Sequence, residues 1–297
     1  MTRRGSTVRF VLVDVFASVP LTGNPVSIVP DADDLTDARM QAIAREFNQS
    51  ETVFVLRPDR PEATWRLRSF TPIGAEVFGA GHNALGTWIW LAADGRLPGG
   101  GGQFAQQIGP DVLPVRVDAG AGQPVLISMD QSAPQFGATV DDRAELAAAL
   151  SLAEQDLAAD AAPQVVATGA GHLMVAVGTR AGVDRAAPHA APLAAILDEA
   201  GGEGCYVYSL QPGEDGAAAY ARFFNPTMGI PEDPATGTAA GPLAARLVAS
   251  GKVPEGTVVI EQGHALGRPS RIQVTIAGTR VTITGSGLVV ADGVLHL

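Results

Sequence analysis

The sequence predicts an α+β protein built from two pseudo-symmetric domains. The chain has 297 residues, enough for two domains of about 150 residues each. Phe70 and Phe224 each open a Phe-x-Pro segment and lie 154 residues apart, while Thr22 and Thr168 each open a glycine-containing turn and lie 146 residues apart. These intervals far exceed the roughly 20–50 residues of solenoid repeats, which favours duplicated domains over a chance similarity of turns.

The first half is predicted to alternate strands with two helices. Thr36 can cap the first helix through its hydroxyl. The second helix is apolar on nearly all sides, which predicts that a sheet encloses it. The predicted strands cover residues 8–15, 26–29, 51–56, 64–70 and 112–117, and the predicted helices cover residues 37–47 and 82–93.

The second half is predicted to repeat this order with additional helices. An Ala/Gly/Leu-rich helix at 238–249 follows the second Phe-x-Pro segment and corresponds to the helix at 82–93. The other predicted helices cover 142–150, 152–159 and 192–200, and the predicted strands cover 125–129, 164–167, 220–224 and the residues around Cys205. We expect an N-terminal lobe at 1–118, a C-terminal lobe at 119–286 and an active site in the cleft between them.

The composition excludes several classes of partner. Hydrophobic residues make up 46% and charged residues 17%, which is typical of a folded globular protein. The formal net charge of −11, without a cluster of Lys and Arg, argues against a nucleic-acid or acidic-membrane partner. No signal peptide or membrane-spanning segment is recognisable, so a cytoplasmic protein is expected.

The sequence predicts neither a metal nor a cofactor. The single cysteine, Cys205, excludes an intrachain disulfide framework and a Cys-based zinc site. The other histidines, His172, His189, His264 and His296, show no ligand spacing with one another. Residues 79–84 fit a nucleotide-binding glycine pattern, but no hydrophobic strand runs directly into them, which disfavours an NAD enzyme.

Two glycines precede helices in corresponding places. Gly81 precedes His82 and Asn83, and Gly237 precedes Thr238, each at the start of an apolar helix. The first N–H groups of a helix have no intrahelical acceptor, so a helix N-terminus readily binds a carboxylate or a phosphate. Two such ends predict one small anionic ligand that is held from both lobes.

Five blocks of the sequence, in order, resemble the phenazine-biosynthesis (PhzF-like) isomerase family. The resemblance runs from residue 13 to about 270 and implies the fold of diaminopimelate epimerase, in which each domain has a curved mixed or antiparallel sheet around a central apolar helix. In relatives the last strand, residues 287–297 here, returns to the first domain, and the sequence leaves open whether it does so in this chain. The resemblance also suggests a homodimer. The blocks are Val13-Asp14-Val15-Phe16 with Gly23-Asn24-Pro25, Asn48-Gln49-Ser50-Glu51-Thr52, Phe70-Thr71-Pro72 with Gly81-His82, residues 229–237, and Glu261-Gln262-Gly263 with Gly267-Arg268-Pro269.

The resemblance also implies which residues form the site. Glu51 would be the catalytic acid and base, and His82 and Asp233 would line the same pocket. Backbone groups at Gly81, Gly237 and Thr238 would hold the substrate carboxylate. Thr238 stands where the family usually has Ser, and it keeps the hydroxyl. Asn83 stands where the family usually has Pro, which puts the substrate in doubt more than the chemistry.

The residues themselves allow these roles and also more ordinary ones. Glu51 begins an apolar strand, where partial removal from water would let its carboxyl accept and return a proton near neutral pH; the alternative is a solvated strand-edge Glu. His82 in a first helical turn is favoured as a neutral donor or relay, and otherwise is a satisfied polar residue. Asp233, held extended before Pro234, is either a site carboxylate or a turn residue.

The leading hypothesis is a cofactor-independent isomerase that transfers a proton on a small carboxylate-bearing substrate. One alternative is a racemase or epimerase of the same fold that uses bases other than cysteine, because Cys205 lies near neither helix start. Another is a non-catalytic small-molecule-binding paralogue. The combination of Glu51, His82 and Asp233 favours an enzyme.

Overall fold

The computed structural model describes residues 7–120, 122–211 and 216–297 and divides the chain into two compact units. Unit 1 comprises Met1–Met129 and Gly285–Leu297, and unit 2 comprises Asp130–Thr284. The first six residues of the predicted N-terminal lobe lie outside the described residues.

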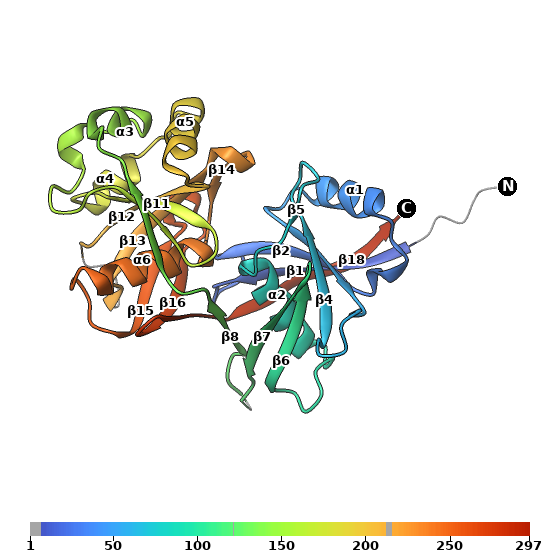
Figure 1. Ribbon diagram of the computed structural model, residues 1–297. Helices are drawn as coiled ribbons and strands as arrows, with labels where there is room; N and C mark the ends of the chain where they lie inside the picture. The colour runs from blue at the N-terminus through green and yellow to red at the C-terminus, as the bar shows by residue number, and fades with distance from the viewer. Residues whose placement is uncertain (1–6, 121, 212–215) are drawn as a thin grey trace. The chain divides into compact units, whose positions relative to one another are not determined.

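The described residues of unit 1 form a mixed arrangement of strands with two helices (Figure 1). Its strands are β1 (Thr7–Val15), β2 (Asn24–Val29), β3 (Thr52–Leu56), β4 (Trp65–Phe70), β5 (Glu76–Val77), β6 (Gly102–Ile108), β7 (Asp111–Asp118), β8 (Leu126–Gln131) and β18 (Gly287–His296), and its helices are α1 (Asp37–Phe47) and α2 (His82–Ala93). The strands pair in the order β18-β1-β2-β3-β4-β6-β7-β8, with β5 added to β4. The pairs β2–β3 and β4–β6 are parallel and the others are antiparallel.

Helix α2 is the central helix of unit 1, and all residues from His82 to Leu91 are buried. It can approach the sheet closely because Gly86 has no side chain. A Cβ at this position would lie 2.4 Å from Val26 Cγ1 and 2.8 Å from Val15 Cγ2.

Helix α1 packs an apolar cluster, including Met40, against another part of the sheet. The side chain of Thr36 caps α1 as predicted, accepting from the Arg39 N–H.

Unit 2 also consists of parallel and antiparallel strands with helices packed on them. Its strands are β9 (Gln135–Thr139), β10 (Gln164–Ala167), β11 (Gly171–Ala176), β12 (Gly204–Ser209), β13 (Ala219–Asn225), β14 (Ile230–Asp233), β15 (Gly256–Gln262), β16 (Ser270–Ala277) and β17 (Arg280–Gly285), and its helices are α3 (Arg143–Ala149), α4 (Arg180–Arg185), α5 (Ala190–Ala200) and α6 (Gly237–Ala249). Apolar residues of α3 and α5 pack on one cluster with Leu173, Val207 and Phe224. Helix α6 is buried along most of its length, as α2 is.

The strand order of unit 2 repeats that of unit 1. The strands pair in the order β9-β10-β11-β12-β13-β15-β16-β17, with β14 added to β13. The parallel pairs β11–β12 and β13–β15 occupy the places of β2–β3 and β4–β6. Helix α6 follows β14 as α2 follows β5. The two predicted pseudo-symmetric domains, each with a mixed sheet and a buried central helix, are confirmed by this correspondence.

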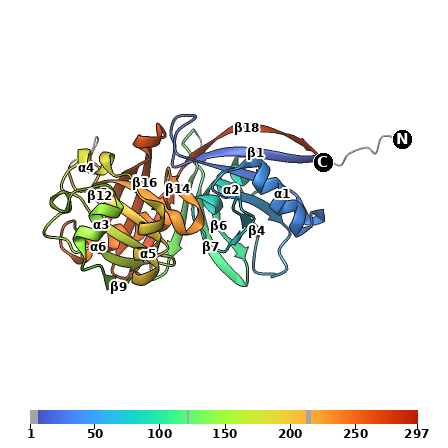
Figure 2. The same ribbon diagram turned by 90° about the horizontal axis from the view of Figure 1, so that it is seen from above.

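The boundaries between the units differ from the expected lobe boundaries at residues 118 and 286. Strand β8 begins at Leu126 and pairs antiparallel with β7, which keeps the chain in unit 1 as far as Met129. At the other end, β18 pairs with the full length of β1, from Thr7 opposite His296 to Val15 opposite Gly287. The two strands run side by side in Figures 1 and 2. The chain therefore returns to unit 1 at Gly285.

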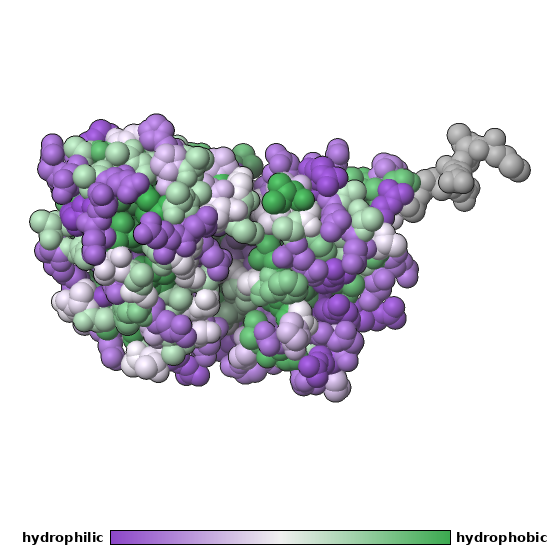
Figure 3. All heavy atoms as spheres, turned by 45° about the horizontal axis from the view of Figure 1, so that its top comes forward, coloured by the Kyte–Doolittle hydropathy of each residue, from purple (hydrophilic) through white to green (hydrophobic). Residues whose placement is uncertain are grey.

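Charged side chains lie mainly on the surface, and hydrophilic residues occupy much of the face seen in Figure 3. Among the described residues, Asp14, Arg222, Asp233 and Glu261 are the buried Asp, Glu and Arg side chains. Arg222 forms a double hydrogen bond with Glu232, at 2.8 and 2.7 Å, and Glu261 pairs with two arginines. The buried charges of Arg222 and Glu261 are therefore compensated inside unit 2.

His172 in β11 gives unit 2 an expected pH dependence. Both ring nitrogens are buried and lack a hydrogen-bond partner among the described residues, and burial lowers the pKa of His172 from 6.5 to about 4. The folded state therefore holds His172 neutral, whereas the unfolded chain binds a proton below pH 6.5. We expect this residue to leave stability unaffected above pH 6.5 and to lower it by about 3 kcal/mol as the pH falls to 4.

Urea unfolding at pH 7.5 and 4.5 measures this effect, with His172→Phe as the variant that cannot titrate. The variant should lose less stability between the two pH values than the wild type. His264→Asn, at an exposed position, is the control. An equal loss in all three proteins would contradict the prediction.

Candidate active site

Glu51 and His82 lie together in unit 1. Glu51 immediately precedes β3, and His82 is the first residue of α2. Their Oε2 and Nε2 atoms are 3.1 Å apart, and the side chains are 16% and 8% exposed. The structure therefore places a partly buried carboxyl in contact with an imidazole at a helix N-terminus, which is an arrangement suited to proton transfer.

Asn83 shapes the loop before α2. Its Oδ1 accepts a hydrogen bond from the Gly81 N–H at 2.8 Å. Its Nδ2 donates to Ser69 Oγ at 2.9 Å and to the Gly79 carbonyl at 3.0 Å. The carboxamide thus fixes the backbone that leads to His82. The predicted substrate contacts of Gly81 and Asn83 stay predictions.

Asp233 lies at the end of β14, close to the start of α6 in unit 2. It is buried, and its Oδ2 accepts a hydrogen bond from Thr236 Oγ1 at 2.5 Å. Thr236 is the N-cap residue of α6, and Gly237 and Thr238 are the first two helical residues. The first-turn N–H groups of α6 therefore lie next to the segment that carries Asp233.

Gln262, at the end of β15, joins both ends of this segment. Its Nε2 donates to the Asp233 carbonyl at 2.7 Å and to Thr236 Oγ1 at 3.0 Å, and its Oε1 accepts from the Thr236 N–H at 3.1 Å. The hydroxyl of Tyr206 donates to the same Oε1 at 2.9 Å. Gln262 is fully buried, so these bonds form without competition from bulk water. The orientation of the Asp233–Thr236 turn depends on them.

A second amide holds α6 from another side. Gln131 Nε2 donates to the Gly237 carbonyl at 3.1 Å, and Thr168 Oγ1 donates to Gln131 Oε1 at 2.7 Å. This contact requires Gly241, because a Cβ there would lie 1.8 Å from Gln131 Oε1. Side-chain hydrogen bonds from Gln262 and from Gln131 therefore fix the start of α6.

The structure brings Glu51 into contact with His82, and it places Asp233, Gly237 and Thr238 around one helix start. The roles assigned to these residues stay predictions. The positioning side chains Tyr206, Gln131 and Gln262 were not singled out as site residues. The block Glu261-Gln262-Gly263 supported the family resemblance, but the contacts of its glutamine depend on strand pairing far along the chain.

Replacing Gln262 with Met is expected to lower the free energy of unfolding by about 3 kcal/mol or more. Methionine fills a similar volume but leaves the Thr236 N–H, the Asp233 carbonyl and the Tyr206 hydroxyl buried without their partner, at a typical cost of about 1–3 kcal/mol each. Tyr206→Phe removes only one of these bonds and should cost about 1 kcal/mol. Urea unfolding compares the two variants, and equal stabilities would contradict the assigned network.

Neither metal-ligand clusters nor membrane helices are found in the described part of the chain. Within residues 7–120, 122–211 and 216–297, no group of three or more His, Cys, Asp or Glu is suitably placed to hold a metal ion. No helix in these ranges combines the length and the apolar character that a membrane span requires.

Comparison with known proteins identifies the family. A family model described as "Phenazine biosynthesis-like protein" matches residues 13–293. The chain belongs to this family. The trans-2,3-dihydro-3-hydroxyanthranilate isomerase of Pseudomonas aeruginosa is 36% identical over 297 aligned residues, which cover 97% of this chain and 99% of the relative. The resemblance predicted from the sequence is confirmed, and this phenazine biosynthesis-like protein is an isomerase.

Solved structures of the family have the same fold. The Bacillus anthracis phenazine biosynthesis protein of the PhzF family gives a TM-score of 0.90 at 28% identity, covering 98% of this chain and 100% of that chain. A hydroxyproline epimerase from Agrobacterium vitis gives a TM-score of 0.65 at 12% identity, covering 100% of this chain and 93% of that chain. The similarity to the epimerase shows the fold alone. The same architecture therefore also occurs in a protein named as an epimerase.

Proposed function

We propose that this isomerase transfers a proton on a small carboxylate-bearing substrate without a cofactor, with Glu51 as acid and base. The observation that supports this proposal most directly is the contact of Glu51 with His82 in a partly buried setting. The named activity of the Pseudomonas aeruginosa relative suggests the substrate class, an amino- or hydroxy-substituted cyclohexadiene carboxylate.

In this proposal, the Glu51 carboxylate removes a proton from a carbon of the substrate. The electron pair of the broken C–H bond moves into the conjugated system, and the Glu51 carboxyl, after its proton has exchanged with solvent, delivers a proton to a different carbon. One C–H bond is broken and one is formed, so no redox partner is needed. His82, whose Nε2 lies 3.1 Å from Glu51 Oε2, orients the carboxyl group.

We assign the substrate carboxylate to the first turn of α6. Gly237 and Thr238 supply backbone N–H groups there, and the positive end of the helix dipole favours an anion. Such groups stabilise the negative charge that develops on the carboxylate as the neighbouring carbon loses its proton. Asp233 is assigned to an amino or hydroxyl group of the substrate.

Proton NMR in D₂O tests the proposal with a panel of amino, hydroxy and cyclic dienoic acids. The expected result is a shift of the substrate double bond together with deuterium at the newly protonated carbon, without any added cofactor. Absence of exchange for every member, or exchange only after a nicotinamide is added, would contradict it.

A racemase that uses non-cysteine bases is distinguished in the same samples by optical rotation. Racemisation would reduce the rotation without moving a double bond. Cys205 is not available as a base, because it is buried in the unit 2 core and burial raises the pKa of its thiol.

We also propose that the protein is a cytoplasmic homodimer, on the basis of the family resemblance. Light scattering on a size-exclusion column should give a mass of about 61 kDa, twice the chain mass of 30.5 kDa. A mass near 30 kDa at micromolar concentration would overturn the dimer.

A further inference from the structure

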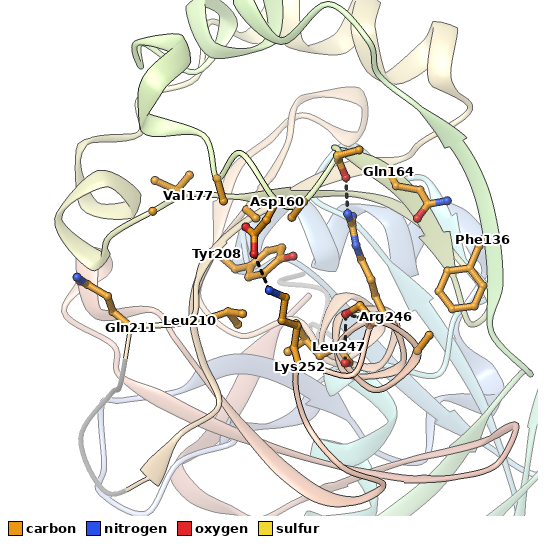
Figure 4. Close-up of a pocket in the computed structure, with 17 residues that line it drawn as sticks. Phe136, Asp160, Gln164, Val177, Tyr208, Leu210, Gln211, Arg246, Leu247 and Lys252 are labelled. Carbon is orange, nitrogen blue, oxygen red and sulfur yellow. Dashed lines mark hydrogen bonds and ion pairs between the residues drawn. The ribbon is translucent and has the colours of Figure 1, made fainter.

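Unit 2 contains a cavity of about 660 Å³ that the proposed isomerase chemistry does not use (Figure 4). It lies beyond the ends of β11 and β12 and beside the last turn of α6, where Ala176, Tyr208 and Ala249 line it. Helix α6 has 13 residues, so its two ends are about 18 Å apart. The cavity is therefore separate from the segment Asp233–Thr238, which lies at the other end of this helix.

The position and the size of the cavity are typical of a ligand site. Strands β11 and β12 are parallel, and the residues that follow their carboxyl ends, including Gly178 and Leu210, line the cavity. In open α/β sheets, ligands commonly bind beyond the carboxyl ends of parallel strands. Binding pockets for small molecules typically have volumes of about 300–1,000 Å³.

The walls of the cavity are mainly apolar. They include Val177, Leu247 and several alanines, together with the ring of Tyr208, which is 2% exposed. Burial raises the pKa of the Tyr208 hydroxyl, so it stays a neutral hydrogen-bond donor. These walls suit a flat hydrocarbon body.

The polar groups of the cavity are concentrated around two cations and one carboxylate. Lys252 Nζ lies 2.5 Å from Asp160 Oδ2, and their side chains are 40% and 67% exposed. Arg246 donates to the carbonyls of Met174 and Ala162, which anchors its guanidinium in place. Figure 4 shows Lys252 reaching across to Asp160 near the Tyr208 ring.

Hydrogen-bond donors outnumber acceptors among these groups. Lys252 has three N–H donors and Arg246 has five, and the bonds named above use one and two of them. With Asp160 ionised, the three charged side chains leave a net charge of +1, although the whole chain carries −11. The positive charge and the unused hydrogen-bond donors both favour an anionic ligand that accepts hydrogen bonds.

We propose that this cavity is a second binding site of the protein, for a small monocarboxylic acid with a flat apolar body. The carboxylate contacts Lys252 at the mouth in competition with Asp160, and the apolar body lies against Tyr208 and the alanine-rich wall. The exposed ion pair of Lys252 and Asp160 is weak enough for a ligand carboxylate to replace it.

Lys252 offers a direct test because it is the only lysine in the sequence. Protein grown with ¹³C-labelled lysine has a single lysine Cε–Hε signal in its NMR spectrum. We expect this signal to shift saturably when 4-methylbenzoate is added, and to stay in place when the neutral 4-methylbenzamide is added at the same concentrations.

Three variants locate the binding. Ala249→Trp fills the mouth from an exposed position at the end of α6 and should weaken binding of 4-methylbenzoate at least tenfold. Asp160→Asn removes the competing carboxylate and should tighten binding severalfold. Glu51→Gln, in unit 1, should leave the dissociation constant unchanged, so the result is independent of the proposed isomerase site. A signal that shifts without saturation, shifts equally with the benzamide, or responds identically in Ala249→Trp would overturn the proposal.

Discussion

Replacement of Glu51 by Gln is expected to lower the rate of deuterium incorporation into the substrate by about 10²–10⁴-fold. The carboxamide keeps the size of the side chain and its contact with His82, but it cannot accept and return a proton. General acid–base catalysis by one side chain typically contributes a factor of this size. Proton NMR in D₂O, with wild type and variant side by side, measures the change directly.

The control is Glu62→Gln, which makes the same chemical change at an exposed position of unit 1. It should leave the exchange rate within about twofold of the wild type. His82→Asn should give an intermediate loss, because it removes the neighbour of Glu51 but not the base itself. Undiminished exchange in Glu51→Gln would end the assignment of Glu51 as the base.

Replacement of Gly263 by Ala is expected to be the most destabilising single-methyl change near the candidate site. Gly263 has φ of +86°, and a Cβ there would lie 2.3 Å from the Arg268 carbonyl oxygen and 2.5 Å from the Pro234 carbonyl oxygen. The left-handed conformation costs an alanine about 1–2 kcal/mol, and a forced backbone shift typically adds about 1–3 kcal/mol. The expected loss is about 3 kcal/mol, or about 10 °C in Tm for a unit of this size.

Gly267→Ala is a matched control in the same segment. Gly267 also has positive φ, +65°, but a Cβ there would meet no atom within 4 Å. It should show the conformational cost alone, about 1–2 kcal/mol. Gly263→Ala should also slow the isomerase, because the added methyl group would displace Pro234, which directly follows Asp233. Equal Tm values for the two variants would contradict the role of the close backbone contacts.

The central helices were well predicted because their sequence signal is local. Helix α2 spans His82–Ala93 as expected, and α6 begins at Gly237, one residue earlier than expected. Both are apolar on nearly all sides and follow a glycine-containing turn, so their burial could be read without knowledge of their neighbours.

The helix expected at 152–159 was wrong, and its failure has a tertiary cause. Only a short 3-10 turn forms there, at Glu154–Asp156. Leu157 instead pairs with Val177 across an isolated bridge, and Asp156 binds the Ala153 N–H and Arg185 through its side chain. Helical spacing of apolar residues does not reveal such distant contacts.

The candidate site, like the fold, could be predicted from the sequence only where its signal is local. The motif around Glu51 and the glycine before His82 could be recognised locally, whereas their 3.1 Å contact depends on how β3 and α2 pack. The hydrogen bonds of Gln262 and Gln131 depend on strands that lie far along the chain from the residues they contact. Glutamines that position other groups follow no spacing rule, so the sequence contains no direct signal for these two.

The matching strand order of the two units agrees with the internal duplication that the recurring sequence landmarks predict. Each unit has a glycine at the fifth position of its central helix, Gly86 in α2 and Gly241 in α6. The surroundings of the two glycines differ, because hydrocarbon side chains face Gly86, whereas amide and hydroxyl groups face Gly241. The same close approach to a central helix is therefore compatible with an apolar setting in one unit and a polar setting in the other.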